Sequence, residues 1–241
     1  MKTISLLRYL IKESIEESAD GKKKIYVLVG PPSVGKSSWI KETFSEIKPY
    51  IINRDDIVES VAESYGWEYD DMFVKPPKDA NEGDAGGKYG VVIKSPSWMT
   101  WQPISFDKVL QANSEVQKRF SERVSAAVSS GQDIVVDMTN MSAGSRKSAL
   151  KPIEGSEQDY EKIAVVFNFR GSEELILKVA EKRAKIAKQM GKSKTIPPAD
   201  MQRMFAAYQD VSASEGFDQV IPVDKTQDIA KSLSESLRRR R

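Results

Sequence analysis

The sequence predicts an α/β protein built around a mostly parallel β-sheet with helices on both faces. Short apolar runs rich in β-branched residues alternate with stretches of helical length, as in sheets whose strands are buried on both sides. One such run, residues 25–29, leads directly into Gly30-Pro31-Pro32-Ser33-Val34-Gly35-Lys36-Ser37, which fits the pattern G-x-x-x-x-G-K-[ST]. A strand, a glycine loop and a helix start therefore organise the chain.

The loop at residues 30–37 has the composition of a phosphate-binding loop. We expect Lys36 to reach the β- and γ-phosphates of a nucleotide, and Ser37 to supply a hydroxyl to Mg²⁺. Pro31 and Pro32 have no N–H group, so the donors must come from Ser33 onward. The alternative is a plain turn between a strand and a helix. The expected nucleotide contacts are Gly30, Ser33, Val34, Gly35, Lys36, Ser37 and Ser38.

Composition limits the chemistry that the chain can use. It has 241 residues, 39% apolar and 30% charged, which is typical of a globular protein, and a net charge of +2, which favours no class of partner. It contains no histidine and no cysteine, so a general base must be a carboxylate, a lysine or a tyrosine. We expect no membrane partner and a cytoplasmic location, because no apolar run reaches transmembrane length.

Residues 1–22 are expected to form an N-terminal amphipathic helix, and residues 23–241 a single domain. Ile4, Leu7, Ile11 and Ile15 recur at helical spacing. Such a helix either packs on the edge of the domain or binds a partner or a membrane surface.

A second strand, residues 50–53, runs into Arg54-Asp55-Asp56. Functional residues of parallel sheets follow the carboxyl ends of strands, so Asp55 and Asp56 are candidate active-site carboxylates. The alternative is that they cap a helix over residues 57–65.

Residues 66–104 are predicted to form a long inserted loop rich in glycine, proline and turn residues. Its aromatic residues either stack on bases while the lysines hold phosphates, or form a small hydrophobic cluster that pins the loop. These residues are Trp67, Tyr69, Tyr89, Trp98 and Trp101, with Lys75, Lys78, Lys88 and Lys94 between them.

The middle of the chain predicts a helix over 105–130 and an apolar strand that ends in Asp137. A carboxylate at that place in a nucleotide site normally holds Mg²⁺. A helix over 142–151, with Arg146 and Lys147 exposed, and a strand over 163–169 follow.

A helix over 172–190 carries Arg183 and several lysines, and a lysine-rich glycine turn precedes Pro197. We expect a lid over the phosphates at about 183–198; a solvated helix face is the alternative. A helix over 198–214, a strand over 217–223, a helix over 225–238 and a basic tail complete the chain.

Several blocks occur in a characteristic order: Gly30 to Trp39, Ile52-Asn53-Arg54-Asp55-Asp56, Val135 to Asn140, Lys182-Arg183, and Thr195-Ile196-Pro197 before Met201 to Met204. Over residues 24–210 they resemble the phage polynucleotide 5′-kinase family of P-loop phosphotransferases. The Asn-Arg-Asp-Asp block is more specific than the phosphate loop.

The resemblance implies a five-stranded sheet in the order 2-3-1-4-5, and transfer of the ATP γ-phosphate, with Mg²⁺, to the 5′-hydroxyl of DNA or RNA. By resemblance Asp55 is the general base, Lys36 and Arg183 contact the phosphates, and Ser37 and Asp137 hold the metal. The acceptor contacts that we expect are Arg54, Asp56, Asp137, Thr139 and Asn140.

Two departures from the family keep other functions open. Val58 stands where the family usually has an arginine on its acceptor side, and the lid has lysines where a second arginine is expected. One alternative is therefore a kinase of a small molecule or nucleotide-sugar, as in toxin-like relatives. An ATPase switch and a structural nucleotide-binding protein are the others. Met138 stands where motor ATPases usually place a water-activating glutamate, and no N-K-x-D guanine motif occurs.

Overall fold

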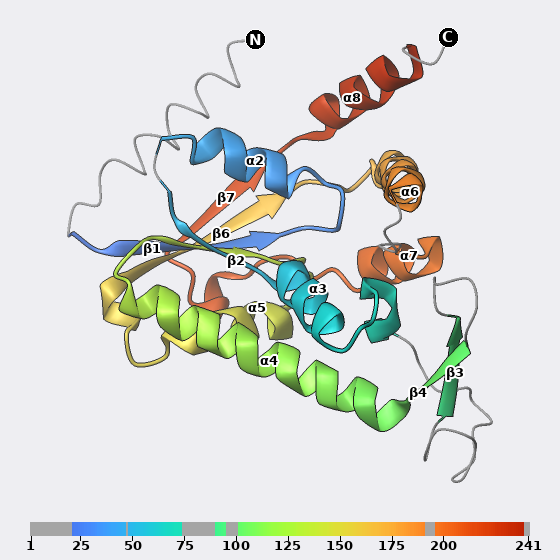
Figure 1. Ribbon diagram of the computed structural model, residues 1–241. Helices are drawn as coiled ribbons and strands as arrows, with labels where there is room; N and C mark the ends of the chain where they lie inside the picture. Colours follow the sequence, from blue (N-terminus) through green and yellow to red (C-terminus); the bar gives the residue numbers. More distant parts are fainter. Residues whose placement is uncertain (1–20, 47, 74–89, 95–100, 191–195, 239–241) are drawn as a thin grey trace. The chain divides into compact units, whose positions relative to one another are not determined.

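The main sheet has five parallel strands in the order β2-β5-β1-β6-β7 (Figure 1). Counted along the chain this is the order 2-3-1-4-5, so the predicted fold class and strand order are confirmed. The computed structural model describes residues 21–46, 48–73, 90–94, 101–190 and 196–238. The strands are β1 (Lys23–Val29), β2 (Tyr50–Asn53), β5 (Ile134–Asp137), β6 (Tyr160–Phe167) and β7 (Gln219–Val223).

The chain divides into two compact units. Unit 1 consists of Met1–Asn53, Arg123–Arg183 and Ile196–Arg241 and contains the main sheet; unit 2 consists of Arg54–Glu122 and Ala184–Thr195. The helices are α2 (Lys36–Thr43), α3 (Arg54–Ser64), α4 (Phe106–Ser129), α5 (Ala143–Leu150), α6 (Glu173–Gln189), α7 (Pro198–Ala206) and α8 (Thr226–Arg238). Short 3-10 helices are η1 (Tyr69–Phe73), η2 (Lys151–Ile153), η3 (Glu157–Asp159) and η4 (Ala213–Glu215).

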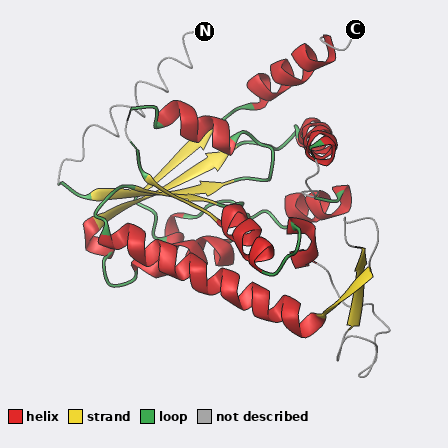
Figure 2. Cartoon of the chain, viewed as in Figure 1, coloured by secondary structure: helices red, strands yellow, loops and turns green. Residues whose placement is uncertain are grey.

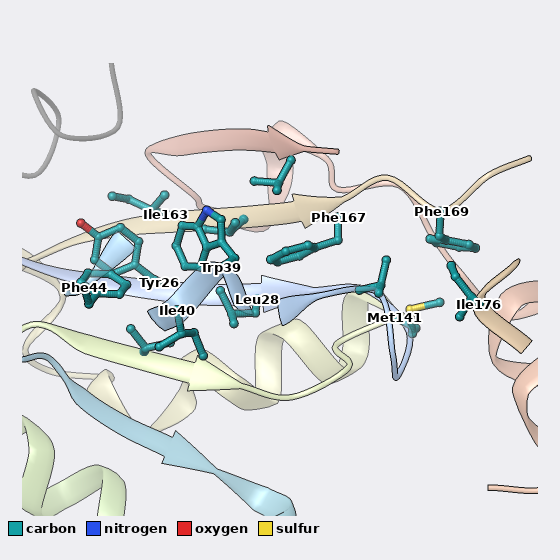
Figure 3. Close-up of a cluster of buried hydrophobic side chains, with 14 of the residues drawn as sticks. Tyr26, Leu28, Trp39, Ile40, Phe44, Met141, Ile163, Phe167, Phe169 and Ile176 are labelled. Carbon is teal, nitrogen blue, oxygen red and sulfur yellow. The ribbon is translucent and has the colours of Figure 1, made fainter. Parts of the chain in front are cut away.

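Within unit 1, α2 and α5 lie on opposite faces of the sheet, which explains why the central strands are apolar throughout (Figures 1 and 2). Side chains of β1 and β6 pack with Trp39 and Phe44 in a cluster of buried rings (Figure 3). The rings of Trp39 and Phe167 meet edge to face, with centroids 6.0 Å apart. This cluster fixes the start of α2 on the sheet, directly after the phosphate loop.

Within residues 66–104, where the sequence predicts a long loop, the described parts contain regular structure. Besides η1, strands β3 (Gly90–Lys94) and β4 (Trp101–Ser105) pair antiparallel. The predictions for the N-terminal helix, for the basic residues after Arg238 and for the aromatic or basic residues at 75, 78, 88, 89 and 98 lie outside the described residues. Within the described part of the chain, no helix has the length and apolar character needed to cross a membrane.

Candidate functional site

The backbone of the phosphate loop bends so that it can surround an anion. Ser33 (φ 66°) and Gly35 (φ 100°) are both left-handed, a conformation that turns neighbouring N–H groups toward one concave side. Gly35 is the residue that precedes α2, and it has no side chain to bind the first N–H groups of the helix. The N-terminus of α2 therefore offers N–H groups of the kind that bind a phosphate, and phosphate binding by this loop remains a prediction.

At both glycines of the loop a Cβ atom would make an unusually tight contact. A Cβ atom at Gly30 would lie 3.0 Å from the Cβ atom of Phe167, and one at Gly35 would lie 3.1 Å from that of Lys225. Val34, between them, is only 1% exposed. The loop is thus packed against the core on one side and against the segment after β7 on the other.

The amino group of Lys36 lies at the loop itself. Its Nζ atom donates hydrogen bonds to the carbonyl oxygens of Gly30 (3.0 Å) and Pro31 (2.9 Å). Ser37 and Ser38, the next residues of α2, are exposed. The structure therefore keeps a cation and two hydroxyl side chains at the same helix start, which are the groups that a bound triphosphate needs.

The segment after β5 is tied to the phosphate loop by Thr139 and to β1 by Asn140. The N–H of Gly30 donates to the carbonyl oxygen of Thr139 (2.9 Å), and Nδ2 of Asn140 donates to the carbonyl oxygen of Leu28 (2.8 Å). Asn140 is left-handed (φ 44°) and 1% exposed. Its buried side chain thus fastens the segment after β5 to β1, and its expected contact with an acceptor remains a prediction.

Asp137 ends β5 and is half-buried. In the sheet register it pairs with Asn53, the last residue of β2. Arg54, Asp55 and Asp56 follow Asn53 immediately in the chain. The ends of β2 and β5 are therefore neighbours, and β5 is in turn the neighbour of β1, which leads into the phosphate loop.

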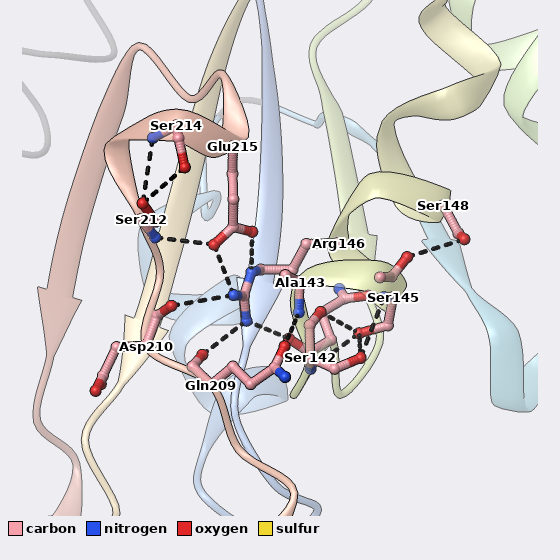
Figure 4. A network of polar contacts seen from close by, with 12 residues as sticks. Ser142, Ala143, Ser145, Arg146, Ser148, Gln209, Asp210, Ser212, Ser214 and Glu215 are labelled. Atoms are coloured by element: carbon pink, nitrogen blue, oxygen red, sulfur yellow. Dashed lines mark hydrogen bonds and ion pairs between the residues drawn. The ribbon is translucent and has the colours of Figure 1, made fainter.

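Arg146 was expected to be exposed, and this expectation is wrong: its side chain is completely buried, whereas Lys147 is exposed as predicted. All five of its N–H groups are bonded (Figure 4). Two reach the carboxylate of Glu215, and the others reach the carbonyl oxygens of Asn140, Gln209 and Asp210. Burial is possible because the charge is paired and every donor is satisfied.

The same network explains why α7 is shorter than predicted. The sequence predicts a helix over 198–214, but α7 ends at Ala206. Beyond it, Gln209 donates its N–H to Met141 and accepts an N–H bond from Ala143 with its side chain. Because the N–H of Gln209 donates to Met141, it is not available for the bond that would continue the helix.

Arg183 of α6 lies next to the phosphate loop. Its Nη1 atom is 3.5 Å from Oγ of Ser33, although the two residues are far apart in the sequence. Loss of surrounding water lowers the pKa of Arg183, but a guanidinium stays charged at physiological pH. The contact supports the predicted place of this arginine beside the phosphates; residues 191–195 of the expected lid lie outside the described residues.

The candidate base and its neighbours begin α3. The helix starts at Arg54, so Asp55 and Asp56 lie inside its first turn, both exposed, rather than at a capping position. Oδ1 of Asp55 accepts a hydrogen bond from the phenol of Tyr69 (3.0 Å). The sequence analysis considered Tyr69 only as a loop aromatic, because a contact across fourteen residues leaves no sequence signal.

The available groups fit a nucleotide-bound Mg²⁺ rather than a metal bound by protein alone. Among the described residues, no three acidic side chains converge on one point. Mg²⁺ usually takes one or two protein ligands and completes its shell with phosphate oxygens and water. A hydroxyl from Ser37 and a carboxylate from Asp137 fit that pattern.

Comparison with known proteins identified one family and several solved structures with low sequence identity to this chain. The model of a family described as an AAA domain matches residues 25–210. The search of curated proteins found no match. A candidate kinase from Chloroflexus aurantiacus aligns with TM-score 0.52 and 11% identity, over 91% of this chain and 98% of that one. At this identity the similarity shows a shared fold.

Two further structures align more weakly. A chain of the Pnkp1/Rnl/Hen1 RNA repair complex gives TM-score 0.47 and 17% identity, over 80% of this chain and 46% of that chain. A gluconokinase from Sinorhizobium meliloti gives TM-score 0.40 and 15% identity, over 91% and 98% of the two chains.

Proposed function

The chain belongs to the AAA-domain family and has the α/β P-loop kinase fold, and from this premise we propose that it transfers the γ-phosphate of ATP to a hydroxyl group, namely the 5′-hydroxyl of a polynucleotide. One observation carries the proposal. The sheet register pairs Asn53, the last residue of β2, with Asp137, the last residue of β5. The Arg-Asp-Asp sequence follows Asn53 directly, and β5 lies beside β1, which leads into the phosphate loop.

The donor side of the proposed reaction uses the phosphate loop. Its N–H groups and the N-terminus of α2 hold the phosphates, and Lys36 and Arg183 counter the charge that moves during transfer. Ser37 and Asp137 would hold Mg²⁺, which when bound neutralises charge on the β- and γ-phosphates.

The acceptor side uses the first turn of α3. Asp55 takes the proton of the attacking hydroxyl, and Arg54 and Asp56 on either side contact the acceptor. Because Asn140 is buried and Thr139 holds Gly30 through its carbonyl, we give these two residues the task of positioning the phosphate loop. We assign Asp137 to the acceptor as well as to Mg²⁺, because its register partner Asn53 directly precedes Arg54 in the chain.

The transfer balances with these groups alone. The acceptor oxygen forms a bond to the γ-phosphorus while its proton passes to Asp55. The bond between the γ-phosphorus and the β,γ-bridging oxygen breaks, and ADP leaves with the electron pair. Positioning and charge stabilisation do most of the work in such reactions, so the packed phosphate loop and the groups named above would supply most of the catalysis.

A second candidate, phosphorylation of a small hydroxyl compound, is favoured by Val58. This residue lies one turn after Asp55 and is 2% exposed, so it offers no cation to a polynucleotide phosphate. The lysines of the predicted lid could supply the positive charge for a polynucleotide phosphate instead.

The test is a label-transfer assay with γ-labelled ATP and a panel of acceptors: single-stranded DNA and RNA with 5′-hydroxyl ends, nucleosides and nucleotide-sugars. Label in an oligonucleotide is the expected result. Label in a small compound alone would replace the first candidate by the second. Release of free phosphate without labelled acceptor would contradict both and indicate an ATPase.

A further inference from the structure

The hydrogen bond between Tyr69 and Asp55 joins two elements of unit 2. Asp55 lies in the first turn of α3, and Tyr69 is the first residue of η1. Oη of Tyr69 donates to Oδ1 of Asp55 at 3.0 Å. Fourteen residues separate them, so helical spacing does not force the contact; the chain must turn back to make it.

Several bonds fix that turn. After the end of α3 the N–H of Trp67 donates to the carbonyl oxygen of Ala62 (2.9 Å). Oδ2 of Asp71 then accepts the N–H of Glu68 (2.8 Å), directly before Tyr69. Met72, in the same short helix, is 2% exposed. The segment that carries the phenol is thus held at both ends, and the phenol reaches Asp55 from a fixed backbone.

The ring of Tyr69 is also packed against a neighbour, and its hydroxyl group stays protonated. It is half-buried and lies 5.0 Å, centroid to centroid, from the ring of Phe73. Burial raises the pKa of Tyr69 well above the usual value, and the negative charge of Asp55 and the hydrogen bond to it raise the pKa further. Asp70 acts in the same direction, whereas Arg54 lowers the pKa. At physiological pH the phenol therefore keeps its proton and can donate it to the carboxylate.

We infer that Tyr69 is a positioning residue for Asp55. Its phenol holds Oδ1 and so restricts the rotation of the carboxylate that takes the proton of the acceptor hydroxyl. The inference rests on the proposed function, because it assigns to Asp55 the role of base. A base helps only when it lies within hydrogen-bond reach of the proton it removes, so a freely rotating carboxylate would act less often.

The kinetic test replaces Tyr69 by phenylalanine, which removes the hydroxyl and keeps the ring. In the Tyr69→Phe protein we expect kcat to fall about 10- to 100-fold, with an unchanged KM for ATP. The matched control is Tyr65→Phe: Tyr65 is 37% exposed and its ring contacts Trp67 instead. The control should keep the wild-type kcat.

A double-mutant cycle separates positioning from a general structural effect. If Tyr69 acts through Asp55, Tyr69→Phe should change the residual rate of the Asp55→Asn protein by less than twofold, because the carboxylate is already gone. An equal fold-loss in both backgrounds, or a wild-type kcat for Tyr69→Phe, would overturn the inference.

A titration tests the pairing without any activity. In NMR spectra of protein with ring-labelled tyrosine, Asp55→Asn should lower the pKa of Tyr69, because the charge and the hydrogen bond that raise it are weakened. A pKa of Tyr69 that does not move would overturn the inference even in an active enzyme. Failure of the wild-type protein to phosphorylate any acceptor would instead contradict the proposed function.

Discussion

Arg146 and Glu215 form a two-point ion pair in the interior of unit 1. Nε and Nη2 of Arg146 lie 2.6 and 2.7 Å from the two carboxylate oxygens of Glu215. Arg146 also binds the carbonyl oxygen of Asn140, and the side chain of Asn140 binds Leu28 of β1. The ion pair therefore supports the end of β1, where the phosphate loop begins. Removing either partner should therefore affect both stability and the loop.

Arg146→Met is predicted to lower the free energy of unfolding by about 3–5 kcal/mol, because it leaves the carboxylate of Glu215 and three carbonyl groups without their donor. Denaturant unfolding measures the change. Arg170→Ala is the control, since the ion pair of Arg170 with Asp210 is exposed. The control should barely move the unfolding midpoint, and equal effects of the two substitutions would refute the structural role of Arg146.

The ion pair should also leave a signature in the pH dependence of stability. The bond from Arg146 lowers the pKa of Glu215 in the folded protein. A lowered folded pKa means that the stabilisation is present above the unfolded pKa of about 4.3 and is lost as the pH falls through the folded value. Glu215→Gln should thus be less stable than wild type at pH 7, and the difference should shrink below about pH 4. A difference that stays constant with pH would contradict this.

Gly35→Ala is predicted to destabilise the protein and to weaken nucleotide binding. Alanine would be forced into a left-handed conformation at φ 100°, with its Cβ atom 3.1 Å from that of Lys225. The expected loss is about 1–3 kcal/mol. Gly144→Ala is a matched control, because Gly144 lies in α5 with open space around it. It should be neutral or add up to about 1 kcal/mol, as thermal unfolding would measure.

Lys36→Ala is predicted to lower the rate of phosphate transfer by about 100- to 1,000-fold, with the fold intact by circular dichroism. The amino group of Lys36 lies at the loop that is expected to bind the phosphates, and alanine has no positive charge to replace it. Lys41→Ala, an exposed change on the same helix, should keep full activity. A Lys36→Ala protein as active as the Lys41→Ala control would remove Lys36 from the reaction.

Local patterns were enough to predict the strands of the main sheet and the order of strand, glycine loop and helix around residues 30–37. The apolar runs that became β1 and β5 are buried on both faces, so their composition marks them clearly. The phosphate loop is a continuous stretch, and its glycines are required by backbone conformation and close contacts that the motif encodes. The strand order came from the resemblance to a family, because register between distant strands has no local signal.

The features that sequence reasoning missed depend on distant partners. Arg146 has the spacing of an exposed helical residue and is buried only because Glu215 and two carbonyl groups come from the segment after α7 and a third carbonyl comes from Asn140. The end of α7 at Ala206 also depends on contacts of this segment with residues that are distant in the sequence. The contact of Tyr69 with Asp55 likewise needs a turn whose geometry no short motif specifies.

The most direct test of the proposed activity compares two forms of one oligonucleotide, with a 5′-hydroxyl and with a 5′-phosphate, incubated with γ-labelled ATP and Mg²⁺. We predict that wild-type protein labels only the 5′-hydroxyl form and that Asp55→Asn reduces this labelling by about 100-fold or more. Labelling of neither form, or labelling of the 5′-hydroxyl form at the full wild-type rate by Asp55→Asn, would contradict the claim that Asp55 directs phosphate to a polynucleotide end.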